Sequence, residues 1–226
     1  MRELGARQLA LDLPHAESFR RDDFLPDASN EAALALVDAW PTWPGRIAAI
    51  VGPSGSGKSH LAAIWAERSG ARILDAASLD AAEVPRALVT GALVLEDLAP
   101  SLVDQPALFH LLNLSREEEA HVLITAKRRL DLDGYTIPDV GSRLRAVPVV
   151  TLDAPSDALL AAVLVKQFAD RQLMLDGDTV SYLLPRMERS LAAARTVVAE
   201  LDRAALSRGR RITRALAAEV VREQES

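Results

Sequence analysis

The chain has 226 residues, no cysteine and a formal net charge of −6. This length allows one large domain, or a medium domain with a small second one. Disulfides, thiolate metal sites and a cysteine nucleophile are excluded, and the acidic balance disfavours stand-alone DNA binding, which usually needs a basic surface. No apolar run approaches the roughly 20 residues of a membrane span, and no signal-peptide core is seen at the N-terminus. We therefore expect a cytoplasmic protein that makes no membrane contact.

The predicted elements fall into three segments along the chain. Residues 1–21 show no sustained periodicity and predict a mobile tail, apart from the alternating leucines at 9, 11 and 13. Short apolar runs then alternate with amphipathic stretches as far as Pro155, which favours a parallel sheet with helices on both faces. The expected helices are at 30–40, 58–68, 105–119 and 139–145, and the expected strands at 47–51, 71–74, 92–95, 121–125 and 147–152. Residues 79–89, which Pro85 interrupts, are expected to form a weak helix or a loop.

No strand pattern follows Pro155. Four helices are predicted there, with a serine, aspartate or threonine before each as N-cap. They cover residues 157–171, 178–186, 191–207 and 215–225. The expected organisation is therefore an N-terminal tail at 1–21, an α/β nucleotide-binding domain at 22–155 and a small all-helical lid domain at 156–226.

The loop after the first expected strand predicts a phosphate site. Its residues fit G-x-x-x-x-G-K-[ST] between a strand and a helix, which is the context this motif requires. Glycines let backbone N–H groups converge on phosphate oxygens, and the helix N-terminus adds positive potential. The lysine reaches the β- and γ-phosphates, and the serine hydroxyl binds Mg²⁺. The site comprises Gly52, Pro53, Ser54, Gly55, Ser56, Gly57, Lys58 and Ser59, with His60 following.

Two carboxylates follow the third expected strand. Glu96 is expected to reach Mg²⁺ directly or through water, and Asp97 to orient an attacking water. At the first of these two acidic positions aspartate is commoner than glutamate, so the sequence leaves the rate of ATP hydrolysis undetermined. Thr125 ends the next strand, beside the phosphate loop, where it can contact the γ-phosphate or the water; Lys127 is the alternative contact.

Three arginines are candidates for contact with phosphate. Arg143 lies just before the last strand, where an arginine can point into a neighbour's site and stabilise transition-state charge there. That role requires a homodimer or another partner protein. Arg189 and Arg195 flank the start of the third lid helix, and either one can face the phosphates from the lid.

Taken together, these motifs resemble the AAA+ core of the bacterial replication initiator DnaA, over roughly residues 22–222. The matching segments are Phe24-Leu25 with Ser29-Asn30, then GPSGSGKSHL, LVLEDL, VLITA, GSRL and LDRAALSRGRRIT. The chain stops before the helix-turn-helix domain that follows this core in the initiator. In this it is similar to the Hda or HdaA branch, the regulatory inactivators of DnaA. The tail fits that branch, because Gln8-Leu9-Ala10-Leu11-Asp12-Leu13 has the form of its motif for the sliding clamp of DNA polymerase III, the β subunit.

The resemblance implies a function for each of these sites. The protein would bind ADP or ATP with Mg²⁺, and Phe24, Asn30 and the neighbouring Ser29 would line the base pocket. The clamp would be bound by Gln8, Leu9, Leu11 and Leu13. The protein would therefore contact DNA only indirectly, through the clamp. Arg143 matches the arginine finger, which would insert into the ATP site of DnaA. The initiator would then hydrolyse its ATP, which prevents re-initiation of replication. The second-sensor arginine is expected near Ala192, between Arg189 and Arg195.

Two other functions fit the phosphate loop. An autonomous P-loop ATPase that loads a helicase or DNA would hydrolyse ATP in response to DNA without a clamp. A small-molecule kinase would need an acceptor pocket and a mobile arginine-rich lid, which the all-helical C-terminal third does not resemble. The clamp motif and the acidic composition favour the regulator, with weak or partner-dependent ATPase activity of its own.

Overall fold

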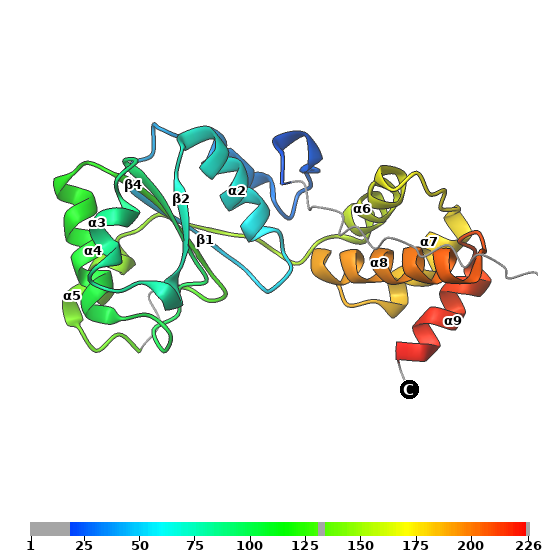
Figure 1. The fold of residues 1–226 in the computed structure, drawn as a ribbon. Coiled ribbons are helices and arrows are strands. Elements are labelled where there is room, and N and C mark those ends of the chain that lie inside the picture. Colours follow the sequence, from blue (N-terminus) through cyan, green and yellow to red (C-terminus); the bar gives the residue numbers. More distant parts are fainter. Residues whose placement is uncertain (1–18, 131–133, 225–226) are drawn as a thin grey trace, which may run out of the picture.

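The computed structural model describes residues 19–130 and 134–224, so the predicted clamp motif at 8–13 lies outside the described residues. The described chain forms an α/β body and a helical body, joined by an extended segment after the last strand (Figure 1). The fold class predicted from the sequence is confirmed: a five-stranded parallel sheet with a small all-helical domain after it.

The sheet has the strand order β2-β3-β4-β1-β5, and every neighbouring pair is parallel. The order places β1, which leads into the phosphate loop, between β4 and β5. Thr125 of β4 lies opposite Ile50 of β1, as expected for a strand that ends beside the phosphate loop. The strands are β1 Ile47–Val51, β2 Arg72–Asp75, β3 Ala92–Glu96, β4 His121–Ala126 and β5 Val149–Thr151.

Both faces of the sheet are covered, because successive side chains of a strand point to opposite sides. In β1, Ala49 and Val51 belong to the core shared with α3, α4 and α5, whereas Ala48 and Ile50 belong to the core shared with α1 and α2. Figure 1 shows α3, α4 and α5 on one side of the sheet and α2 on the other. These helices are α1 Glu31–Asp38, α2 Lys58–Ser69, α3 Glu83–Ala87, α4 Gln105–Glu117 and α5 Pro138–Arg145.

The helical body has a separate core around Leu164, Phe168 and Leu201. The side chains of Ser156, Asp176, Ser190 and Thr213 each accept a hydrogen bond from a backbone N–H of the helix they precede, so all four predicted caps are present. Its helices are α6 Asp157–Asp170, α7 Gly177–Leu183, the 3-10 turn η3 Leu184–Arg186, α8 Leu191–Arg208 and α9 Arg214–Gln224. Within the described ranges, no helix has the length and apolar character needed to cross a membrane.

The segment at 79–89, predicted as a weak helix or a loop, contains both in the structure. A 3-10 turn, η2, occupies Ala76–Ser78, and α3 covers only Glu83–Ala87. The side chain of Asp80 accepts hydrogen bonds from the N–H groups of Ala82 and Glu83 at 2.8 Å each, which places the helix start there. Such a local side-chain bond competes with helix formation further upstream.

The tryptophans form a cluster beside the sheet. The rings of Trp43 and Trp65 are stacked with centroids 5.2 Å apart, and His121 meets the edges of Trp40 and Trp43 at 5.8 and 6.0 Å. Burial lowers the pKa of His121 from its ordinary 6.5, and the nearby charge of Arg46 lowers it further. The cluster is therefore built around a neutral imidazole.

This lowered pKa predicts a stability that falls with acid. The folded state binds the His121 proton less readily than the unfolded state, so its contribution is complete above pH 6.5 and is lost as the pH falls below that value. The free energy of unfolding, measured in urea at pH 7.5 and 5.5, should fall less on acidification in His121→Gln than in the wild type. His110→Gln, at an exposed position, is the matched control and should behave as the wild type does. An equal fall in wild type and His121→Gln would contradict this assignment.

Candidate nucleotide-binding site

The phosphate loop connects the end of β1 at Val51 to the start of α2 at Lys58. Gly55 and Gly57 have φ values of +71° and +106°, which side chains other than glycine rarely adopt. Gly52 is required for a different reason: a Cβ there would lie 2.5 Å from the carbonyl oxygen of Leu152. The sequence thus folds into a loop whose backbone is free to approach a ligand closely.

The Lys58 amine lies inside this loop. Its Nζ donates to the carbonyl oxygens of Gly52 at 2.9 Å and Pro53 at 2.8 Å, and the residue is almost fully buried. Burial lowers the pKa of Lys58, while the charge of Asp97 opposes the shift. Beside it, the Oγ of Ser56 is buried and has no hydrogen-bond partner among the described residues. Phosphate oxygens would supply the counter-charge and the acceptor that these two groups lack, so the loop fits a phosphate ligand.

The two predicted carboxylates lie at the end of β3. Glu96 is the last strand residue, and its Oε1 is buried without a hydrogen-bond partner in the described part of the chain. Asp97 has a φ of +51°, and its backbone N–H donates to the Oγ1 of Thr125 at 3.0 Å. The almost completely buried Thr125 hydroxyl therefore holds the backbone of Asp97 from the neighbouring strand, a link that the sequence did not predict.

Mg²⁺ usually binds through one or two carboxylates together with substrate phosphates and water, so a cluster of protein ligands is not needed. Among residues 19–130 and 134–224, no group of three or more histidine, cysteine or acidic side chains is arranged to hold a metal alone. The unpartnered Oε1 of Glu96 and the exposed Ser59 after the lysine fit an ion that is held mainly by the nucleotide.

Phe24, which is predicted to line the base pocket, packs against His60 of α2. The rings of Phe19 and Phe24 meet the His60 ring edge-on at 5.3 and 5.2 Å, and the His60 Nε2 lies 3.0 Å from the Arg20 carbonyl oxygen. Burial lowers the pKa of His60, although this carbonyl opposes the shift. The segment before α1 thus packs against the helix that starts at the phosphate loop.

Asn30 is buried, and its side-chain amide bonds the backbone of the segment before α1. Its Nδ2 donates to the Leu25 carbonyl oxygen, and its Oδ1 accepts from the Asp27 N–H, both at 3.0 Å. Asp27 in turn accepts from the hydroxyls of Ser29 at 2.6 Å and Ser156 at 2.9 Å. Since Ser156 caps α6, Asp27 links the wall of the predicted base pocket to the first helix of the lid. The D-x-S spacing signals a local turn at Asp27, but nothing in the sequence signals the bond to Ser156.

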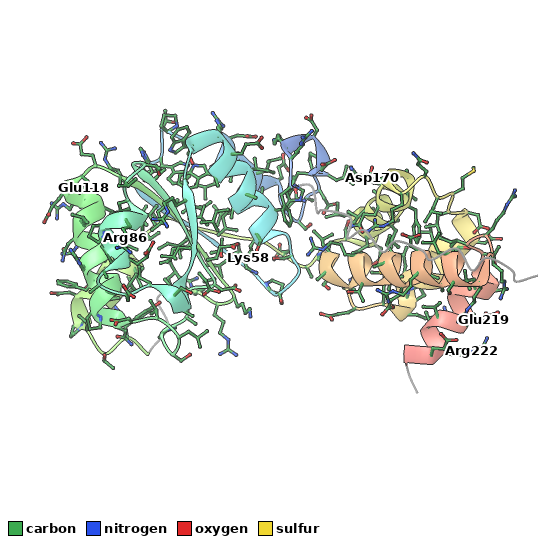
Figure 2. The ribbon with its side chains drawn as sticks, in the orientation of Figure 1. Lys58, Arg86, Glu118, Asp170, Glu219 and Arg222 are labelled. Carbon is green, nitrogen blue, oxygen red and sulfur yellow. The ribbon has the colours of Figure 1, made fainter. Side chains whose placement is uncertain are left out.

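The helical body meets the phosphate loop directly through the start of α8. The backbone N–H of Leu191 donates to the Gly55 carbonyl oxygen at 2.8 Å. A Cβ added at Gly55 would lie 2.7 Å from the Ser190 Cβ. Figure 2 shows Lys58 at the end of the α/β body that faces the helical body. The loop therefore follows a strand of the sheet and contacts the start of α8.

This contact predicts an effect of Gly55→Ala on the lid. The added methyl group cannot coexist with Ser190 at that distance, so the Leu191–Gly55 hydrogen bond should break. Hydrogen exchange of the Leu191 amide should become on the order of tenfold faster, as expected for losing one hydrogen bond. Gly91→Ala is the control, because Gly91 also has a positive φ, of +73°, but has open space around it. Equal exchange in both variants would contradict the contact.

The structure separates the two candidate second-sensor arginines. Arg189 pairs with Asp157 at 3.1 Å, and both side chains are mostly exposed. Arg195 lies one helical turn beyond Leu191, and its charge is close enough to lower the pKa of His60. Arg195, rather than Arg189, is therefore the arginine that α8 brings to the His60 side of the site.

Arg143 lies elsewhere. Its guanidinium stacks over the Phe109 ring at 5.3 Å, and it lines a groove with Ile47, the first residue of β1. The phosphate loop begins after the last residue of β1, and five strand residues span roughly 16 Å. Arg143 and the phosphate loop of the same chain are thus at opposite ends of a strand. Phe109 is a contact that the sequence analysis missed, because a cation–π pair between two helices leaves no sequence signal.

A five-stranded parallel sheet of this order, a glycine loop between β1 and α2, and a helical body seated on that loop define a P-loop protein of the AAA+ class. Residues 157–220 match the family model described as the lid domain of Hda. The helical part of the chain is therefore similar to the Hda lid domain, and the described chain as a whole has the fold of DnaA-related AAA+ proteins. Comparison with curated proteins gave no match.

Solved structures share this fold at low sequence identity. Domain III of the Thermotoga maritima replication initiation protein DnaA is 16% identical with a TM-score of 0.73, and the alignment covers 91% of this chain and 96% of that one. AMPPCP-bound DnaA from Aquifex aeolicus is 19% identical with a TM-score of 0.63, covering 80% of this chain and 64% of that one. The Thermotoga maritima RuvB Holliday junction branch migration motor is 14% identical with a TM-score of 0.70, covering 91% and 72%.

Proposed function

We propose that this protein binds an adenine nucleotide and Mg²⁺ at the Gly52–Ser59 loop, docks on the DNA polymerase sliding clamp and stimulates ATP hydrolysis by DnaA. The observation that carries the proposal is the placement of Arg143. It lies at the far end of β1 from the phosphate loop of its own chain, so it is suited to act on the ATP of another protein. The Hda-type lid at 157–220 supports DnaA as that protein.

In this proposal the bound nucleotide acts as a structural switch. Lys58 and Ser56 hold its phosphates, and Glu96 with Ser59 holds the Mg²⁺ ion. When bound, Mg²⁺ neutralises phosphate charge. Arg195 approaches from α8, whose N-terminus already touches Gly55. The nucleotide therefore fixes the lid relative to the sheet, while Thr125 keeps the backbone of Asp97 in place.

Arg143 carries the activity on the partner. Its guanidinium is half-buried over Phe109, which restricts its orientation before the partner arrives. A pre-ordered cation costs little reorganisation when charge develops on a transferring phosphoryl group. The hydrolysed ATP belongs to DnaA, so the protein's own turnover can be slow.

Docking on the clamp is tested by a pull-down. The wild-type protein should be retained by immobilised sliding clamp, whereas Gln8→Ala and Leu11→Ala should each lose most of that binding. Ala10→Ser, inside the same motif but at a position the motif leaves open, should bind as the wild type does. Retention of both Gln8→Ala and Leu11→Ala would reject docking through this segment and favour an autonomous ATPase, which would respond to DNA without the clamp.

A further inference from the structure

A groove of about 450 Å³ lies at the end of the α/β body that is remote from the phosphate loop. It is formed where the C-terminal end of α4 meets the start of β1 and the turn between α5 and β5. Figure 2 shows Glu118, which follows α4, at the opposite end of this body from Lys58. The floor is apolar, with Ile47, Leu112 and Val147, and Arg143 is part of the wall.

The rim of the groove carries unbalanced positive charge. Its lining contains Arg46, Arg116 and Arg143 but only one carboxylate, that of Glu119. Arg46 uses that carboxylate, donating to Glu119 Oε2 at 2.8 Å and to the Glu119 carbonyl oxygen at 2.7 Å. Arg143 stacks on Phe109, and Arg116 makes no ion pair with the described residues. The guanidinium groups of Arg116 and Arg143 therefore line an apolar groove whose one carboxylate is already paired with Arg46.

The excess of positive charge is confined to the groove. Residues 22–155 contain 11 lysines and arginines against 19 aspartates and glutamates, a balance of −8. A body of that charge repels a nucleic acid, whose phosphates need an extended basic surface. The groove instead combines a small apolar floor with two cations, which suits an apolar side chain next to a carboxylate.

We propose that this groove binds a segment of the ATP-holding partner in which a carboxylate is adjacent to an apolar side chain. The inference rests on the proposed function, because Arg143 both lines the groove and acts on the partner's ATP. Arg116 pairs with the partner's carboxylate, and the apolar floor holds the neighbouring side chain. Docking at the groove sets the affinity of the complex, whereas Arg143 sets the rate of hydrolysis within it.

A titration of this protein into an assay of ATP hydrolysis by DnaA, with clamp loaded on DNA, distinguishes the role of the groove in affinity from the role of Arg143 in rate. Arg116→Glu should raise the concentration needed for half-maximal stimulation by about tenfold or more, because a like charge replaces the attractive one. The maximal rate should stay at the wild-type value. Arg116→Ala should shift the concentration in the same direction by less, and it avoids extending the acidic run at 117–119.

Arg86→Glu is the matched control, since it makes the same charge change at an exposed site on α3, away from the groove. It should leave both parameters unchanged. If the wild type stimulates but both Arg116 variants match its half-maximal concentration, the groove proposal is overturned and the proposed function stands. The groove proposal is also overturned if the Arg116 variants lower the maximal rate but leave the half-maximal concentration unchanged. It is overturned as well if these variants bind duplex DNA less tightly and that loss accounts for the shift in half-maximal concentration. If the wild type does not stimulate at all, the proposed function itself fails.

Discussion

Arg143→Ala should abolish the stimulation of ATP hydrolysis by DnaA. An arginine supplied in trans stabilises the charge that spreads over the transferring phosphoryl group, and its removal costs on the order of 10³-fold in rate or more. The effect should be confined to the partner reaction, because Arg143 lies at the far end of β1 from the phosphate loop of its own chain. Nucleotide affinity of the variant, measured by calorimetry, should equal that of the wild type.

The control for this experiment is Arg145→Ala. Arg145 is an exposed arginine two residues further along α5, so it reports any general effect of removing a charge from that helix. It should stimulate hydrolysis within a few-fold of the wild type. If Arg143→Ala stimulates as well as Arg145→Ala does, Arg143 is not the group that acts on the partner.

Lys58→Ala should lose nucleotide binding. The Lys58 amine is held inside the phosphate loop by two carbonyl oxygens, and burial disfavours its charge until an anion arrives. A charge-assisted contact of this kind contributes about 1.5–3 kcal/mol, so the affinity for ADP should fall roughly 10- to 150-fold. Calorimetry measures this directly, and the rise in melting temperature that ADP gives the wild type should be largely lost.

Arg68→Ala tests whether the effect is specific. Arg68 is on the same helix but at its C-terminal end, where it bonds the backbone of Asp38 and Trp40 instead of the loop. It should bind ADP with wild-type affinity, although its melting temperature can fall. Unchanged ADP affinity in Lys58→Ala would remove the phosphate loop from the proposed site.

The sheet and the phosphate loop follow from local features of the sequence. Apolar runs that end in glycine or in acidic residues predict buried parallel strands, and the loop motif predicts both its own conformation and the helix after it. The placement of Thr125 beside the loop followed from the strand order expected for this class, which the pairing of β4 with β1 confirms. The strand and loop inferences succeed because they depend on residues that are close in sequence, whereas the placement of Thr125 rests on the strand order of the class.

The contacts between distant segments were not predictable in the same way. Asp27 bonds Ser156, and Lys166 pairs with Asp23 at 2.7 Å, so the segment before α1 is tied to the lid at two points. Each pair is separated by well over a hundred residues, and no periodicity or motif connects them. The choice between Arg189 and Arg195 also depended on the orientation of α8, which is set by the contact of Leu191 with Gly55.

These contacts would couple nucleotide binding to the position of the lid. The phosphate loop touches α8, and the segment beside His60 touches α6, so both ends of the predicted nucleotide pocket contact the lid. A ligand that contacts the loop and the His60 segment would stabilise one lid position over others. Nucleotide occupancy would in this way control the conformation that the partner meets.

The central proposal is action in trans, and one measurement tests it most directly. ATP bound to DnaA is followed in single turnover, with clamp loaded on DNA, in the presence and absence of this protein. We predict that conversion to ADP accelerates strongly only when the protein and the loaded clamp are both present. Hydrolysis by DnaA at the same rate with and without the protein would contradict the proposal.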